Sequence, residues 1–241
     1  MIRICRYVLL ACYFVVAALV GALGCLLRPF NPDNSRLAAK MFSAVGLKIL
    51  GIDLKTEGKE RFQDMAPGVV VSNHQSNLDL FVHGANVPRN TVSVGKRSLI
   101  YIPFFGQVYW LAGNIMIDRN NSKKSIGKMD AVTQAIKEKG TSIWVFAEGT
   151  RNKIPGLAPF KKGAFHMAIQ AQAPIYPVVA STYKRRLNFS KWRSGNARIK
   201  IMEPIPTLGL SIDDLDELMA RVHALMEQTL ADLDQRIAQL A

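Results

Sequence analysis

An apolar run from Val8 to Leu27 (VLLACYFVVAALVGALGCLL) contains no charged residue, and its most polar side chain is Tyr13. Twenty residues at the helical rise of about 1.5 Å per residue make a helix about 30 Å long, which matches the hydrocarbon core of a bilayer. Arg3 and Arg6 precede the run and Arg28 follows it. This feature predicts a membrane-embedded helix at the N-terminus.

A cleaved signal peptide is the alternative interpretation of this run. The apolar region of a signal peptide is usually about 7–15 residues long, which is shorter than the run found here. The residues from Ala22 to Cys25 resemble a lipoprotein processing site, but apolar Leu26 and Leu27 follow them. We therefore expect the segment to be retained.

A second helix is predicted over Arg36–Leu50, after a turn at Asn31–Ser35. Its apolar side chains fall mostly on one face, as in an amphipathic helix. The two helices would form a hairpin that enters one leaflet and returns, and a single span is the simpler alternative. Both arrangements attach the chain to a membrane. We expect residues 1–50 to form this membrane-anchoring part.

Short apolar runs alternate with helical patterns after Gly51, which is typical of an α/β sheet covered by helices on both faces. The expected strands are Ile52–Thr56, Val69–Ser72, Thr91–Gly95, Ile115–Asp118, Ser142–Ala147, Ile175–Ala180 and Ala197–Met202. The expected helices are Leu78–Ala85, Ser122–Lys139, Gly163–Gln172 and Ile212–Leu240. Because no repeat or long linker interrupts this pattern, residues 51–241 are predicted to be one domain.

The charge distribution points to an anionic partner. The chain carries a net +13, and the acidic C-terminal segment from Ser211 has a balance of −5, so residues 1–210 carry +18. Such a body attracts nucleic acid or an anionic membrane. The cluster Lys184–Arg193 mixes cations with aromatic residues and suits a membrane interface. The three cysteines lie within the first 25 residues, which leaves none for a zinc site or a disulfide framework elsewhere.

A polar cluster, Asn73-His74-Gln75-Ser76-Asn77-Leu78-Asp79, follows the buried strand VVVS. His74 is therefore expected at the carboxyl end of a strand, where open α/β sheets present their ligands. Across this turn the Asp79 carboxylate would bind one ring nitrogen of His74 and leave the other free to act as a general base. Asn77 is expected to cap the helix that begins near Asp79. The alternative is that these side chains only satisfy turn hydrogen bonds.

A second polar turn, Phe146-Ala147-Glu148-Gly149-Thr150-Arg151, also follows an apolar strand. Arg151 offers a planar guanidinium that suits phosphate oxygens, and Gly149 permits close approach of the backbone to a ligand. Glu148 would accept hydrogen bonds from the backbone or from substrate hydroxyls. A structural ion pair between Glu148 and Arg151 is the alternative.

Taken together, these segments resemble the glycerolipid acyltransferase family, specifically its bacterial 1-acyl-glycerol-3-phosphate acyltransferases. The N-H-x4-D motif is matched by Asn73, His74 and Asp79, and F-x-E-G-T-R is matched by Phe146 to Arg151. A lysine and an aromatic Pro/Gly stretch at residues 95–106 and a proline-containing strand at residues 174–179 complete the pattern, in the family's order. The resemblance implies an α/β domain around a mixed sheet, tethered by N-terminal helices.

The resemblance further implies transfer of an acyl group to the sn-2 hydroxyl of lysophosphatidic acid, giving phosphatidic acid for phospholipid biosynthesis. The acyl donor would be acyl-CoA or acyl-acyl carrier protein, with no metal ion or resident cofactor. His74 would be the general base, oriented by Asp79. The substrate-binding residues would be Asn73, Lys96, Arg119, Glu148, Gly149, Thr150 and Arg151. Lys96, Arg119 and Arg151 would hold the acceptor phosphate.

Several alternatives remain open from the sequence. Ser76 lies close enough to His74 for a covalent acyl-serine route, although the chain lacks a G-x-S-x-G nucleophile elbow. Another acceptor, such as glycerol-3-phosphate or a different lysophospholipid, would share the same motifs. A membrane-tethered basic protein that binds nucleic acid is the non-enzymatic alternative, and no nucleic-acid-binding motif supports it. Because acyl carriers are cytosolic, the resemblance implies the inner membrane of the cell, with the catalytic domain facing the cytoplasm.

Overall fold

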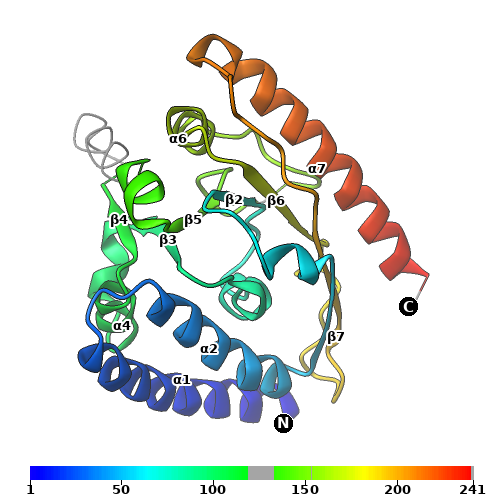
Figure 1. Ribbon diagram of the computed structural model, residues 1–241. Helices are drawn as coiled ribbons and strands as arrows, with labels where there is room; N and C mark the ends of the chain where they lie inside the picture. The colour runs from blue at the N-terminus through cyan, green and yellow to red at the C-terminus, as the bar shows by residue number, and fades with distance from the viewer. Residues whose placement is uncertain (119–132, 153, 240–241) are drawn as a thin grey trace.

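The computed structural model describes residues 1–118, 133–152 and 154–239, and their strands form one seven-stranded sheet (Figure 1). The strand order across the sheet is β1-β7-β6-β2-β5-β3-β4. The strands are β1 (Ile52–Glu57), β2 (Val69–Ser72), β3 (Thr91–Lys96), β4 (Ile115–Ile117), β5 (Ser142–Phe146), β6 (Ile175–Ala180) and β7 (Gly195–Ile201). Each lies within two residues of a strand predicted from the sequence.

The sheet is mixed, as the resemblance implied. Strands β6, β2, β5, β3 and β4 are parallel, whereas β7 runs antiparallel to β6 and carries β1 parallel to itself. Ser72 at the end of β2 pairs with Phe146 of β5 and with Val178 of β6. The segments that leave β2, β5 and β6 therefore emerge along the same edge of the sheet.

The helices follow the predicted pattern closely. The described α-helices are α1 (Ile2–Leu27), α2 (Asp33–Leu50), α3 (Asp79–Val82), α4 (Phe105–Leu111), α6 (Gly163–Ala171) and α7 (Leu215–Ala238). The 3-10 helices are η1 (Lys59–Phe62), η2 (His83–Asn86), η3 (Arg97–Tyr101) and η4 (Ile212–Asp214). Of the helix expected over 122–139, residues 133–139 are helical and 122–132 lie outside the described residues. The short helix α4 was not predicted.

The two faces of the sheet bury separate cores because side chains alternate along each strand. Val69 and Val71 of β2 lie in a core covered by α6 and α7, with apolar residues of both helices. Val70 of β2 and Trp144 of β5 lie in the core on the opposite face, which α1, α2 and α3 cover. Figure 1 shows α7 on one side of the sheet and the α1–α2 pair on the other.

Helix α2 packs directly against the sheet, and α1 lies along the outer side of α2 (Figure 1). The buried positions of α2 include Phe42, Gly46 and Leu50, whose spacing of four residues places them on one face. The two N-terminal helices thus form a hairpin in space. Helix α1 is the one described helix that is long and apolar enough to cross a membrane by length and composition.

The outward face of α1 exposes large apolar side chains. Its residues that are at least half exposed are Ile4, Val8, Leu9, Val16, Leu19, Val20, Leu23, Leu26 and Leu27. Tyr101 of η3, Phe104 before α4 and Trp110 of α4 are also exposed, and α4 packs beside α1. An exposed apolar surface of this kind marks a protein–membrane or protein–protein contact.

The start of α1 is fastened to the connection between β6 and β7, residues 181–194, which we call the β6–β7 connection. The guanidinium of Arg6 is buried there and donates hydrogen bonds to several groups of this segment. The acceptors are the carbonyl oxygens of Phe189 (3.1 Å), Lys191 (2.7 Å) and Trp192, and Ser194 Oγ (2.5 Å). A buried guanidinium is stable only when its donors are satisfied in this way. The contact therefore fixes the N-terminal helix relative to the sheet.

Candidate active site

The turn that follows β2 brings His74 and Asp79 together. His74 Nδ1 lies 2.5 Å from Asp79 Oδ2, and the side chain of Asp79 is almost completely buried. Because a carboxylate accepts, the ring must donate from Nδ1, which leaves Nε2 as the basic nitrogen. The predicted contact between these two residues is confirmed in the geometry.

Asp79 is held by further donors. Its Oδ2 accepts the backbone N–H of Gln75 (2.8 Å) and of Ser76 (2.9 Å), and its Oδ1 accepts the hydroxyl of Tyr183. Burial by itself would raise the pKa of Asp79, but the hydrogen bond from His74 and smaller contributions from His83 and Tyr183 lower it below the usual value. Asp79 is therefore a charged carboxylate in a buried site.

The expected cap by Asn77 is wrong. Helix α3 begins at Asp79 with Leu78 as its N-cap and no side-chain cap bond, and Asn77 is exposed. The turn instead uses Asp79 itself, which reaches back to the preceding backbone, and Ser76 Oγ, which accepts the N–H of Leu78 (3.1 Å). These acceptors leave Asn77 without a capping role.

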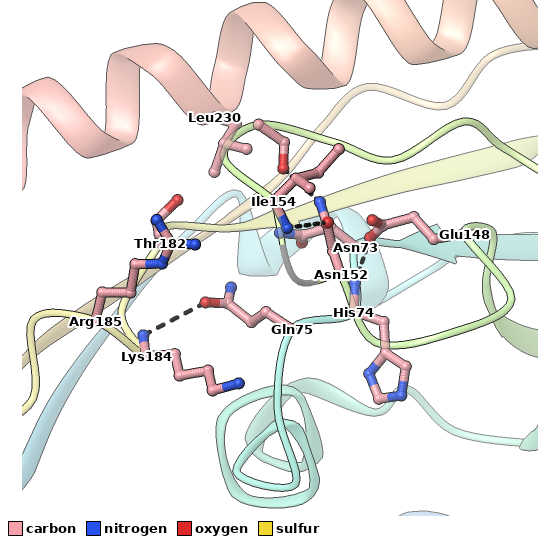
Figure 2. A pocket seen from close by; sticks show the side chains of 11 residues that line it. Asn73, His74, Gln75, Glu148, Asn152, Ile154, Thr182, Lys184, Arg185 and Leu230 are labelled. Carbon is pink, nitrogen blue, oxygen red and sulfur yellow. Dashed lines mark hydrogen bonds between the residues drawn. The ribbon is translucent and has the colours of Figure 1, made fainter.

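The imidazole of His74 stacks on Phe146 at the end of β5, with ring centroids 4.2 Å apart and an angle of 21° between the planes. Its side chain is 20 % exposed, so a substrate can reach it. Figure 2 shows the ring pointing away from α7. Phe146 belongs to the core on the α1–α2 face, and His74 therefore lies toward the side of the sheet that carries the N-terminal helices.

Glu148 joins the two predicted motifs. Its buried carboxylate accepts the backbone N–H of His74 at Oε1 (2.7 Å) and that of Ala158 at Oε2 (2.9 Å). Burial raises the pKa of Glu148, and these two hydrogen bonds oppose the rise. The N–H of Asn152 in turn donates to the carbonyl of His74 (2.7 Å). Glu148 thus bonds to the backbone rather than pairing with Arg151.

Asn73 ties β2 to its neighbour. Its side-chain amide donates to the carbonyl of Ala180 and accepts the N–H of the same residue, both at 2.8 Å. This pair of bonds joins the last residue of β6 to the turn that carries His74. The asparagine of the motif therefore fixes the backbone next to the base.

A cavity of about 130 Å³ lies at this edge of the sheet (Figure 2). Three of the predicted site residues line it, namely Asn73, His74 and Glu148. The other lining residues are Gln75, Asn152, Ile154, Gly156, Thr182, Lys184, Arg185 and Leu230. The two cationic residues that line this cavity, Lys184 and Arg185, come from the β6–β7 connection and are not among the predicted site residues.

Four other predicted residues are not among those that line this cavity, namely Lys96, Gly149, Thr150 and Arg151. Thr150 and Arg151 are exposed on the turn after β5, where Gly149 adopts a φ of 71° that favours glycine. Lys96 is exposed at the end of β3. Arg119 lies outside the described residues. The assignment of Lys96, Arg119 and Arg151 to the acceptor phosphate stays a prediction, as does the role of Gly149 and Thr150 in substrate binding.

Tyr183 is the residue of the site that the sequence did not reveal. It is fully buried in the β6–β7 connection and donates to Asp79, which lies 104 positions earlier in the chain. One signal in the sequence could have indicated Tyr183. It follows β6 closely, and the other site residues also lie just after parallel strands. Within the described ranges, no group of three or more His, Cys, Asp or Glu residues could hold a metal ion.

Comparisons with known proteins agree with this geometry. A family model described as "Acyltransferase" matches residues 53–181, which span both polar turns and most of the sheet. The chain is similar to the 1-acyl-sn-glycerol-3-phosphate acyltransferase of Haemophilus influenzae, at 38% identity over 99% of both chains. It is also similar to the protein of the same name from Escherichia coli, at 36% identity over 99% of this chain and 97% of that one.

A more distant relative is the human 1-acyl-sn-glycerol-3-phosphate acyltransferase alpha, at 38% identity over 82% of this chain and 70% of that protein. In fold, the chain is similar to the crystal structure of the 1-acyl-sn-glycerophosphate acyltransferase PlsC from Thermotoga maritima. The TM-score is 0.74 at 22% identity, over 96% of this chain and 97% of that one. From its matched domain, its relatives and the placement of both motifs, the chain belongs to the acyltransferase family.

Proposed function

We propose that this protein transfers an acyl group from a thioester to the sn-2 hydroxyl of 1-acyl-sn-glycerol-3-phosphate, giving phosphatidic acid. The observation that carries the proposal is the His74–Asp79 pair, with Nδ1 engaged at 2.5 Å and a partly exposed ring at the carboxyl edge of the sheet. The names of the relatives, which match over nearly the whole chain, supply the acceptor.

A secondary alcohol is a weak nucleophile at neutral pH, so a base must take its proton as the new bond forms. In the proposed reaction, His74 Nε2 accepts the proton of the sn-2 hydroxyl while the alcohol oxygen attacks the thioester carbon. The C–S bond then breaks, and the proton passes from His74 to the leaving thiolate. The charged Asp79 carboxylate stabilises the imidazolium between these two steps.

The donor in this proposal is acyl-CoA or acyl-acyl carrier protein. Because the thioester is already activated, we expect the transfer to need neither ATP nor a metal ion. The acceptor phosphate would be bound by the exposed guanidinium of Arg151 together with Lys96. No further cofactor is proposed.

The acceptor is a lipid, and the exposed apolar face of α1 supports a location at a membrane. His74 lies on the side of the sheet that carries α1 and α2, so a lipid held at that face would approach the base directly. We propose that the protein works at the cytoplasmic membrane with the catalytic domain in the cytoplasm, where acyl carriers are found.

The test is a transfer assay with the purified full chain in lipid nanodiscs, using acyl-CoA or acyl-acyl carrier protein as donor. The acceptors are lysophosphatidic acid, glycerol-3-phosphate and lysophosphatidylethanolamine. We expect phosphatidic acid from the first, and a loss of about 10²–10⁴-fold in kcat for His74→Ala. His223→Ala is the control, because His223 lies on α7 and is also partly exposed.

Three results would contradict parts of the proposal. Near-normal turnover by His74→Ala would exclude His74 as the base. Preferential use of glycerol-3-phosphate or of the larger lysophospholipid would replace the acceptor while leaving the acyl-transfer chemistry in place. An acyl-enzyme trapped on Ser76 would favour the covalent route instead.

A further inference from the structure

Tyr183 reaches the catalytic pair from a separate part of the chain. It is one of the largest side chains that are fully buried, and its hydroxyl donates to Asp79 Oδ1. Burial, reinforced by the charge of Asp79, raises the pKa of Tyr183 well above 10. The hydroxyl therefore keeps its proton and remains a donor at neutral pH.

The donors of Asp79 are divided unequally between its two oxygens. Oδ2 receives the ring N–H of His74 and the backbone N–H groups of Gln75 and Ser76. Oδ1 receives the hydroxyl of Tyr183. All donors to Oδ2 belong to the same short turn as Asp79, whereas Tyr183 comes from the β6–β7 connection. The hydrogen bond from Tyr183 therefore restrains the Asp79 carboxylate from a different element of the fold.

The segment that carries Tyr183 is itself firmly placed. Gln75 Nε2 donates to the carbonyl of Ser181 (2.9 Å), which joins the two segments next to the Tyr183 contact. At the far end of the connection, Arg6 binds the backbone near Ser194. Because both ends are fixed, the phenol hydroxyl is presented to Asp79 from a rigid support.

We propose that Tyr183 is a positioning residue for the general base, acting on His74 through the orientation and charge of Asp79. The inference rests on the function proposed above. Tyr183 is fully buried and contacts Asp79 rather than the surface that a substrate can reach, so its effect falls on the chemical step and not on the binding of the acceptor.

Removal of the hydroxyl has a defined electrostatic consequence. The hydrogen bond from Tyr183 lowers the pKa of Asp79, so its loss makes the carboxylate more basic. A more basic Asp79 holds the Nδ1 proton more strongly and favours the imidazolium form of His74. The other titratable groups that act on Asp79 are His74 and His83 from its own segment and Glu148 from the turn after β5, and these stay unchanged.

The experiment compares Tyr183→Phe with Tyr176→Phe in the full chain in nanodiscs. Tyr176 lies on β6, is equally buried, and donates to the carbonyl of Ala66 (3.0 Å), away from Asp79. For Tyr183→Phe we expect kcat to fall about tenfold, as for loss of an outer-shell partner. We also expect an unchanged KM for the acceptor and an acid limb of the kcat profile displaced to higher pH. Tyr176→Phe should show neither change.

Because stability also falls at low pH, the folded fraction of each variant is measured at every pH by circular dichroism, and kcat is expressed per folded enzyme. A loss of stability then cannot imitate a displaced acid limb. If the limb of Tyr183→Phe coincides with that of Tyr176→Phe while His74→Ala is inactive, Tyr183 is only structural and the proposed function stands. If His74→Ala keeps its turnover, the proposed function is wrong, and the inference about Tyr183 falls with it. A rise in acceptor KM at constant kcat would place Tyr183 in substrate binding and overturn the inference.

Discussion

Two buried carboxylates lie next to His74, and their surroundings shift their pKa values in opposite directions. Asp79 contacts the imidazole and a phenol hydroxyl, and its pKa is lowered. Glu148 contacts only backbone N–H groups at its two oxygens, and burial raises its pKa. The carboxylate that contacts His74 is therefore the one whose charged form its surroundings favour. Glu148 instead supports the backbone that carries the base.

His83 is a third titratable group at this position, buried beneath the pair and packed edge-on against Trp144 and Phe146. Burial lowers the pKa of His83 to about 4, with the charge of Asp79 acting in the opposite direction. The unfolded chain, with its ordinary value near 6.5, therefore binds more protons between these two pH values. Stability from a neutral His83 is complete above about pH 6.5 and is lost as the pH falls toward 4.

The prediction is that the free energy of unfolding falls by about 2 kcal/mol between pH 7.5 and pH 5 because of this residue. His83→Gln should remove that part of the pH dependence, whatever its effect on absolute stability. Urea unfolding in detergent micelles at several pH values gives the slope of the unfolding free energy against pH for the unaltered chain and for His83→Gln. Parallel slopes for the two proteins would show that His83 does not titrate in this range.

At the scale of elements, the contact between α2 and α3 sets where the catalytic turn sits. Gly46 on α2 faces Phe81 on α3, and a Cβ added to Gly46 would lie 2.3 Å from the Phe81 ring. Glycine lowers helix stability by about 1 kcal/mol relative to alanine, so its place within α2 reflects the close approach of Phe81. The approach also fixes the helix that begins at Asp79.

We predict that Gly46→Ala destabilises the protein by about 1–3 kcal/mol despite the gain in helix propensity, because the Phe81 ring must move. Gly24→Ala on α1 is the matched control, since a Cβ there meets no atom within 4 Å. Thermal unfolding in nanodiscs and kcat are the measurements. Equal effects of the two substitutions would show that the α2–α3 contact adapts without cost.

The elements most accurately predicted from the sequence were those whose signal is local. The buried run VVVS of β2 and the polar residues after it indicate a strand and its functional end without reference to the rest of the chain. Helix α4 was missed because its seven residues lie within an aromatic run that has no clear helical period. Asparagine suits a capping role, which is why the sequence predicts a cap at Asn77. In the structure, however, the backbone N–H groups of Gln75 and Ser76 donate to Asp79.

The partners of the site residues depend on which strands lie side by side, and the sequence does not state this directly. Tyr183 meets Asp79 because β6 pairs with β2, although 104 positions separate the two residues. Glu148 meets the backbone of His74 because β5 pairs with β2 on the other side. The motifs therefore predicted the contact between His74 and Asp79, whereas the supporting contacts required the topology.

At the scale of the whole molecule, the apolar face of α1 lies next to the cationic side chains of the β6–β7 connection. Arg6 of α1 joins the two by its hydrogen bonds to this connection. The connection carries Lys184, Arg185, Arg186, Lys191 and Arg193 with no acidic residue, and Trp192 is 82% exposed. Basic and aromatic side chains beside an apolar helix suit the headgroup region of an anionic leaflet. Apolar burial and charge attraction would then act at one surface.

We predict that the full chain stays in the membrane fraction in about 1 M salt, where the Debye length is only about 3 Å, because apolar burial is not screened. The double variant Leu19→Asp/Leu23→Asp, at two half-exposed positions of α1, should be released by the same wash. Leu208→Asp/Leu225→Asp adds the same charge at exposed positions away from α1 and should stay bound. Release of the unaltered chain by salt would contradict an embedded α1.

The Arg6 contact also has a consequence for the order in which the chain can fold. The ribosome synthesises Arg6 early, whereas the groups that accept its hydrogen bonds lie 183 to 188 positions later in the chain. At a synthesis rate of roughly 5–20 residues per second, the helix waits on the order of ten to forty seconds for them. During that time α2, which is synthesised next, can cover the inner side of α1, and a bilayer would cover its outward apolar side chains. Because the contact joins distant parts of the chain, we expect it to form after the folding transition state and to stabilise the finished protein mainly by slowing its unfolding.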